Sequence, residues 1–202
     1  QGDWSSDVCS SDLMKIGVYT SNPLVPLPSY ATESASCFDL AYYNPDKNRI
    51  KGYNERNGEI EAWPAAGPKG FMFPSGARLL VPTSMIFDLP TGYDMRVHPR
   101  SGISLKRGLT LINAEGVIDQ DYTDFLYIPM INLSQVDIFV GEGDRLAQAE
   151  IRPARKQRYY QMSLSWIEVP WAGVAEVDFF RLDTPPEKKG NRAGGFGSTG
   201  TK

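Results

Sequence analysis

The stretch FLYIPMINLSQVDIFVGEGD, residues 125–144, decides the fold class of this chain. It contains two short runs rich in β-branched and aromatic residues, 125–133 and 136–140, and Gly141 and Gly143 follow the second run. Runs of this length, bounded by turn residues, are typical of β-strands, and neither shows the longer apolar periodicity of an amphipathic helix. The stretch therefore predicts consecutive short strands.

The same pattern extends in both directions along the chain. Further strand-like runs lie at 14–20, 77–89, 93–97, 109–113 and 146–151. Turn residues recur about every ten positions, and no stretch between Met14 and Pro153 favours a long amphipathic helix. Short strands at this spacing predict an all-β sandwich or barrel, whereas dinucleotide-binding folds and β/α-barrels require alternating helices.

Four segments depart from the strand pattern. Residues 1–13 carry the near-repeat SSDV and SSDL without an apolar face, and we interpret them as a non-native leader. The polar, Pro- and Gly-rich segment 44–70 and the segment 153–190, which opens with a basic cluster, are predicted insertions in a single domain. That domain spans residues 14–190. The glycine-rich tail 191–202 cannot bury enough surface to fold alone, so we expect it to be mobile unless a ligand orders it.

Composition excludes several classes of partner. A formal net charge of -3 gives no general electrostatic reason to bind nucleic acid. No apolar run approaches the roughly 20 residues needed to cross a bilayer. Two cysteines and one histidine cannot supply a zinc cluster of four ligands, and we expect both thiols to be reduced. The composition predicts a cytoplasmic protein that binds neither nucleic acid nor membrane.

Arg100, Ser101 and Gly102 form the first cluster that could carry chemistry. An arginine offers a planar fork of donors that suits a phosphate or a carboxylate. A serine beside a glycine lets both a hydroxyl and a backbone N–H approach an anion. The alternative is a type I turn with a surface arginine.

The second cluster is NAEGVIDQDY, residues 113–122. Asp119 and Asp121 lie on the same side if the backbone is extended, because side chains alternate along a strand. Paired carboxylates can hold a cation or act as a general base. A polar turn with two solvated acids is the alternative interpretation.

The third cluster is the tail RAGGFGSTG, residues 192–200. Its glycines resemble phosphate-binding loops, but no Gly-Lys-Ser/Thr follows, so it does not match a P-loop. Phe196 has nothing local to pack on, which suggests that it stacks on the base of a ligand. The alternative is a disordered tail without a function.

Taken together and in order, these segments resemble the five motifs of the trimeric dUTP pyrophosphatase (dUTPase) family. The matching motifs are SCFDL at 36–40, PRSG at 99–102, GVIDQDY at 116–122, GDRLAQ at 143–148 and the tail at 192–200. The stretch 71–153 is similar to the family almost throughout. The third and fifth motifs are the most specific.

The resemblance implies a distorted jelly-roll or β-clip barrel with a flexible C-terminal tail, and hydrolysis of dUTP to dUMP and pyrophosphate. Asp119 matches the carboxylate that activates the water attacking the α-phosphorus. Tyr122 matches the aromatic residue that packs under the deoxyribose and excludes a 2′-hydroxyl, and Asn113 matches a residue that contacts the base. The other substrate-binding positions implied are Arg100, Ser101, Gly102, Gln148, Arg192, Phe196, Gly197, Ser198 and Thr199.

The resemblance also implies a metal and an oligomer. Mg²⁺ is the expected cofactor, with Asp39 holding it through water, because Mg²⁺ keeps several waters and bridges substrate phosphates. The family builds each active site from three subunits, so we expect a homotrimer. In such an assembly the tail of one subunit closes a site shared by the other two.

Some positions depart from the family pattern and leave alternatives open. Cys37 stands where the first motif usually has glycine, and residues 123–125 differ from the usual continuation of the third motif. The two insertions are longer than in compact members and are similar to those of phage-encoded members. A dCTP deaminase shares the fold but uses a glutamate in its catalytic segment. A non-catalytic interaction module is the second alternative.

Overall fold

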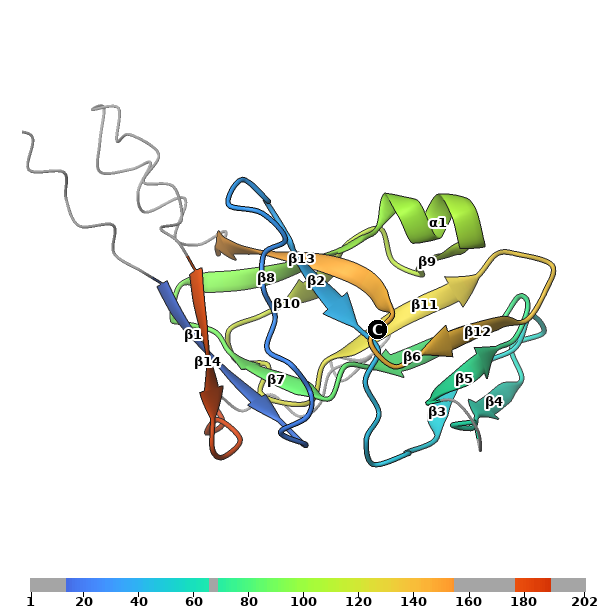
Figure 1. Ribbon diagram of the computed structural model, residues 1–202, viewed down its shortest axis with the longest axis horizontal. Coiled ribbons are helices and arrows are strands. Elements are labelled where there is room, and N and C mark those ends of the chain that lie inside the picture. The colour runs from blue at the N-terminus through green and yellow to red at the C-terminus, as the bar shows by residue number, and fades with distance from the viewer. Residues whose placement is uncertain (1–13, 66–68, 155–176, 190–202) are drawn as a thin grey trace, which may run out of the picture.

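The computed structural model describes residues 14–65, 69–154 and 177–189. These residues form fourteen strands and one short helix (Figure 1), which confirms the predicted all-β fold class. The elements are β1 (Met14–Thr20), β2 (Phe38–Ala41), β3 (Ile50–Tyr53), β4 (Glu59–Ala62), β5 (Gly70–Phe73), β6 (Arg78–Pro82), β7 (Met85–Asp88), β8 (Tyr93–Pro99), α1 (Ser101–Arg107), β9 (Leu109–Leu111), β10 (Gly116–Ile118), β11 (Tyr127–Asn132), β12 (Ile138–Gly141), β13 (Arg145–Pro153) and β14 (Val177–Leu182). In this described part of the chain, no helix is long and apolar enough to cross a membrane.

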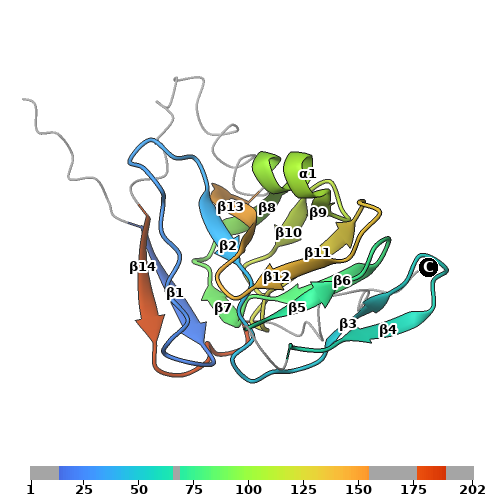
Figure 2. The ribbon, with the colours of Figure 1, turned by 45° about the vertical axis from the view of Figure 1, so that its right-hand side comes forward.

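Hydrogen bonds arrange the strands in four sheets. Their strand orders are β14-β1-β7, β10-β8-β13-β2, β4-β3-β6-β11-β9 and β12-β5. The pairings are antiparallel except for that of β1 with β14. A view turned by 45° shows the two larger sheets side by side, with α1 over β9 (Figure 2).

The sheets enclose one apolar core. On β8, for example, Met95 and Val97 point inward and are 0% and 3% exposed, while Arg96 and His98 lie on the opposite face. Period-two alternation of this kind is the expected signature of a sheet with one buried face. Residues from all four sheets join the core, including Ile16, Phe38, Phe71, Leu79, Ile128 and Val140. Full burial of each such side chain stabilises the fold by about 1.5–3 kcal/mol.

The strand-like run 77–89 is two strands, β6 and β7, that belong to different sheets. The break falls at Ser84, whose φ of 58° is left-handed. Side-chain hydrogen bonds stabilise this bend, because Thr83 Oγ1 donates to Leu126 O at 2.9 Å and Ser84 Oγ donates to Tyr43 O at 2.8 Å. Because the residues on both sides of the bend are apolar, the sequence pattern predicts one continuous strand and not two.

The sequence pattern does not reveal α1. The helix spans seven residues and buries only Ile103, so no apolar periodicity can mark it. Its C-terminus is regular, since Gly108 adopts a left-handed φ of 70° and its N–H donates to Ser104 O. Lys106 and Arg107 in the last turn suit the negative end of the helix dipole.

Parts of both predicted insertions are built into the sheets. Within 44–70, β3 and β4 form a hairpin that joins β6, with Gly52 opposite Leu79. A Cβ on Gly52 would lie 2.0 Å from Arg78 O, so only glycine permits this close pairing. Within 153–190, β14 lies beside β1, and the Phe179 ring lies 4.8 Å from that of Phe38.

Candidate active site

Three strands bring the first group of predicted site residues together. In the register of β2, β13 and β8, Asp39 lies opposite Gln148, and Gln148 lies opposite His98. Arg100 follows the end of β8 directly and is the N-cap residue of α1. Motifs that are separated by about 60 and 45 positions in the chain therefore meet because antiparallel strands place them side by side.

Asp39 is held by two arginines. Its Oδ1 lies 2.8 Å from Arg100 Nε, and its Oδ2 lies 2.9 Å from Arg145 Nη1. Arg100 Nη1 also donates to Arg145 O at 2.8 Å, and Gln148 Nε2 donates to Pro99 O at 3.1 Å. We call Asp39, Arg100 and Arg145 the arginine cluster. Sequence reasoning missed Arg145, although it lies inside the fourth motif, between Asp144 and Leu146.

Ser101 and Gly102 open α1 beside the arginine cluster, and both are exposed. The first N–H groups of a helix have no partner within the helix. A Cβ on Gly102 would meet nothing within 4 Å, so the space over this backbone is open. A phosphate could therefore approach both the Ser101 hydroxyl and the main chain.

The second group lies on residues 109–122, a segment that we call the Asp119 hairpin, although its two strands belong to different sheets: β9 pairs with β11, and β10 pairs with β8. Asn113 lies in the connection between the strands, and its Nδ2 donates to Glu115 O at 3.0 Å. Asp119 follows the last residue of β10 and is exposed. Tyr122 is half-buried, and its hydroxyl donates to Phe125 O at 2.8 Å.

The backbone between Asp119 and Asp121 is not extended. It forms a turn in which Tyr122 N–H donates to Asp119 O at 3.0 Å. The expectation that the two carboxylates share one side of a strand is therefore wrong, because its premise of an extended chain does not hold. The turn instead brings Tyr122 back toward Asp119.

Asp119 and the arginine cluster lie at opposite ends of β8. Ile118 pairs with Met95 near the start of that strand, whereas Arg100 follows its last residue, Pro99. Met95 and Pro99 are four positions apart along the strand, which is roughly 13 Å at about 3.3 Å per residue. Asp119 and Arg100 each lie one position further outward, so a single chain does not bring them together.

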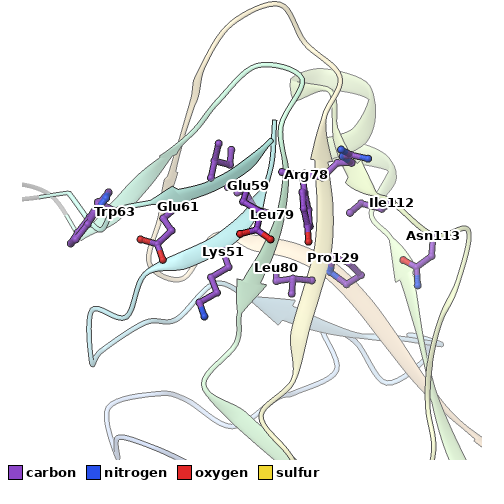
Figure 3. Close-up of a pocket in the computed structure, with 13 residues that line it drawn as sticks. Lys51, Glu59, Glu61, Trp63, Arg78, Leu79, Leu80, Ile112, Asn113 and Pro129 are labelled. Carbon is purple, nitrogen blue, oxygen red and sulfur yellow. The ribbon is translucent and has the colours of Figure 1, made fainter. Parts of the chain in front are cut away.

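A groove of about 1100 Å³ runs beside the Asp119 hairpin (Figure 3). Trp63 and Asn113 lie at its two ends, and its floor includes Leu80 and Pro129 of paired strands. Tyr53 of the inserted hairpin also lines it. Of the predicted site residues that the structure describes, only Asn113 lines the groove, so the groove adjoins this part of the candidate site.

Asp39 is poorly suited to bind a metal directly. Guanidinium groups already occupy both carboxylate oxygens, at 2.8 and 2.9 Å. Among residues 14–65, 69–154 and 177–189, no group of three or more His, Cys, Asp or Glu side chains could hold a metal ion. A resident Mg²⁺ bound by protein carboxylates is therefore not supported by these residues.

Cys37 is the departure from the first motif that lies next to this cluster. Burial, together with the charges of Glu150 and Asp39, raises the pKa of the Cys37 thiol above its usual value. The thiol therefore stays protonated at neutral pH, which does not suit a nucleophile or a metal ligand. Cys37 therefore receives no chemical role at this site.

The predicted tail residues Arg192, Phe196, Gly197, Ser198 and Thr199 lie outside the described residues. Their assignment as the closing segment therefore stays a prediction.

Comparison with known proteins identifies the family. The dUTPase family pattern matches residues 67–162. A deoxyuridine 5′-triphosphate nucleotidohydrolase of Caulobacter vibrioides is 34% identical over 179 residues, which cover 89% of this chain and 88% of the relative. The similarly named protein of Dinoroseobacter shibae is 36% identical over 176 residues, covering 87% and 88%.

Solved structures agree with the fold. The dUTPase of Staphylococcus bacteriophage 80alpha matches 69% of this chain and 90% of its own, with a TM-score of 0.53 and 16% identity. A dUTPase from phage phi11 of S. aureus, solved with a structural Mg(II) ion, covers the same shares with a TM-score of 0.51 and 18% identity. The predicted family is confirmed by the sequence relatives: the chain belongs to the dUTPase family.

Proposed function

We propose that this chain hydrolyses dUTP to dUMP and pyrophosphate. The observation that carries the proposal is the turn at the end of β10, which leaves Asp119 exposed and joins the Tyr122 backbone to that of Asp119. A general base must come within hydrogen-bond reach of the proton that it removes, and an exposed carboxylate is accessible to a bound substrate and its attacking water. The membership of the chain in the dUTPase family supports the same reaction.

Asp119 is the proposed general base that activates the water attacking the α-phosphorus. Tyr122 is proposed to pack under the deoxyribose. Its hydroxyl is tied to Phe125 O at 2.8 Å, which fixes the ring in one orientation. A fixed ring leaves no space for a 2′-hydroxyl, so UTP should be excluded by steric overlap. Asn113 is proposed to contact the base.

Arg100 and Ser101 are the proposed phosphate ligands, with Gly102 offering its open backbone and Gln148 beside them. These groups and Asp119 must act on the same α-phosphate, yet Asp119 and Arg100 lie at opposite ends of β8. A second subunit that brings its own arginine cluster to the Asp119 hairpin would complete the site. This geometry supports the proposed homotrimer, whose third subunit would supply the tail.

Mg²⁺ is proposed to enter with the triphosphate of the substrate. It binds readily to phosphate oxygens while keeping several waters, and there it would neutralise charge on the triphosphate. The paired state of Asp39 supports a different role for this residue, because its carboxylate aligns the two arginines.

Asp39→Asn tests that role. The variant should raise KM for dUTP about tenfold, because hydrogen bonds to charged groups contribute about 1.5–3 kcal/mol. The Mg²⁺ concentration that gives half-maximal rate should stay unchanged. Steady-state kinetics over a Mg²⁺ titration measure both quantities. A large increase in the Mg²⁺ requirement with an unchanged KM would restore Asp39 as a metal residue.

Pyrophosphate release with dUTP, dCTP, dTTP and UTP tests the proposed function. We expect turnover with dUTP alone among the four. Ammonia release from dCTP would instead identify a deaminase of the same fold. The absence of turnover with every nucleotide would favour a non-catalytic interaction module.

A further inference from the structure

Backbone pairing alone attaches β10, the strand that leads into Asp119, only weakly to its sheet. β10 is a three-residue edge strand whose ladder with β8 covers Gly116, Val117 and Ile118 (Figure 2). A short edge strand has few hydrogen bonds to resist displacement. Catalysis, by contrast, requires that the reacting carboxylate be held to within a fraction of an ångström.

A buried ion pair on β8 provides one additional attachment. Arg96 Nε and Nη2 donate to the two carboxylate oxygens of Asp94, each at 2.8 Å, and Asp94 is 4% exposed. The hydrogen bonds and charge of Asp94 raise the pKa of the Arg96 guanidinium, so it remains charged. Arg96 Nη1 donates to Glu115 Oε2 at 3.0 Å.

Glu115 transmits this attachment to the hairpin. It directly precedes β10, and its backbone carbonyl accepts the hydrogen bond from Asn113 Nδ2. The next residue, Gly116, packs so closely on β8 that a Cβ would lie 3.1 Å from Val97 Cβ. Arg96 therefore fixes the position at which the hairpin enters the sheet.

A second attachment lies on the other side of Asp119. Gln120 Oε1 accepts a hydrogen bond from Gly92 N–H at 2.6 Å. Gly92 lies in the turn between β7 and β8 and adopts a left-handed φ of 88°, which favours glycine. Gln120, which directly follows Asp119, is thus bound to the turn that leads into β8.

We propose that the Arg96–Glu115 and Gly92–Gln120 contacts position Asp119 for catalysis, as a two-point clamp between the hairpin and β8. The inference rests on the proposed function of Asp119. Neither Glu115 nor Gln120 is assigned a contact with substrate, so both are positioning residues. Glu115 also positions Asn113, whereas Gln120 acts only on the Asp119 side. Substitutions of Glu115 and of Gln120 should therefore change kcat and KM differently.

Side-chain substitutions test the clamp. Gln120→Ala should lower kcat for dUTP about tenfold with little change in KM, because only the reacting carboxylate loses its support. Glu115→Ala should lower kcat similarly and also raise KM, because the backbone that carries the carbonyl bound by Asn113 loses its attachment to Arg96. Gln120→Glu and Glu115→Gln keep the accepting oxygen and should recover most of the lost activity.

Glu61→Ala is the matched control. Glu61 pairs with Arg49 at 2.8 Å, and its side chain is 36% exposed, as is that of Glu115. All variants should unfold within a few degrees of the wild-type temperature, since each loses one hydrogen bond or one partly exposed ion pair, and such contacts contribute little to stability. Kinetic constants of Gln120→Ala and Glu115→Ala within twofold of Glu61→Ala would overturn the clamp. Absence of dUTP turnover in the wild type would instead overturn the proposed function.

Discussion

Asp119→Asn is expected to lower kcat for dUTP by about 10²–10⁴-fold, the usual contribution of a positioned general base. Asparagine keeps the size of the side chain but cannot accept the proton of the attacking water. The base and phosphate contacts assigned to Asn113 and Arg100 remain, so the Kd for dUTP should change little. Single-turnover pyrophosphate release measures the rate, and calorimetry on the inactive variant measures the affinity.

Asp121→Asn is the control for this experiment. It makes the same chemical change two residues further along the same turn. We expect its kcat to stay within a few-fold of wild type, because the role of general base is proposed for Asp119 and not for Asp121. Near-normal turnover in Asp119→Asn, or an equal loss in Asp121→Asn, would contradict that assignment.

The strand content could be predicted from the sequence because it depends on local pattern. The alternation of Met95 and Val97 with Arg96 and His98 marks a strand with one buried face, and the structure has one there. Sheet membership could not be predicted in the same way. The bend at Ser84 divides one apolar run between two sheets. It depends on side-chain hydrogen bonds to the carbonyl groups of Tyr43 and Leu126, which are distant in the sequence.

The sequence predicts residues for the candidate site but does not predict their contacts. The motif around Asp119 and the Arg100–Gly102 motif could be recognised because they occur in the same order along the chain as in the dUTPase family. The two arginines on Asp39 follow from the register of β2 with β13, which no single segment encodes. The sequence does not predict the role of Gln120, because a glutamine in a polar turn is usually solvated. Its contact with Gly92 N–H is apparent only in the folded structure.

Mixed assemblies of Asp119→Asn and Arg100→Ala should regain activity that neither variant has alone. Arg100→Ala removes a charged phosphate donor, and losing such a donor costs about 10²–10³-fold in kcat. If each site takes its hairpin from one subunit and its arginine cluster from another, random mixing leaves about a quarter of the sites with both parts intact. The refolded mixture should therefore reach about a quarter of the wild-type rate.

The two variants are unfolded together, refolded and assayed for pyrophosphate release, with each variant refolded alone as the control. Ile118 pairs with Met95 and Arg100 follows Pro99, so one folded chain keeps the two residues at opposite ends of β8. Sites built within single subunits would give no recovery on mixing. Recovery without unfolding would show that subunits exchange freely, and it would support the same shared site. An active, strictly monomeric protein in gel filtration would contradict it, because no second arginine cluster would then reach Asp119.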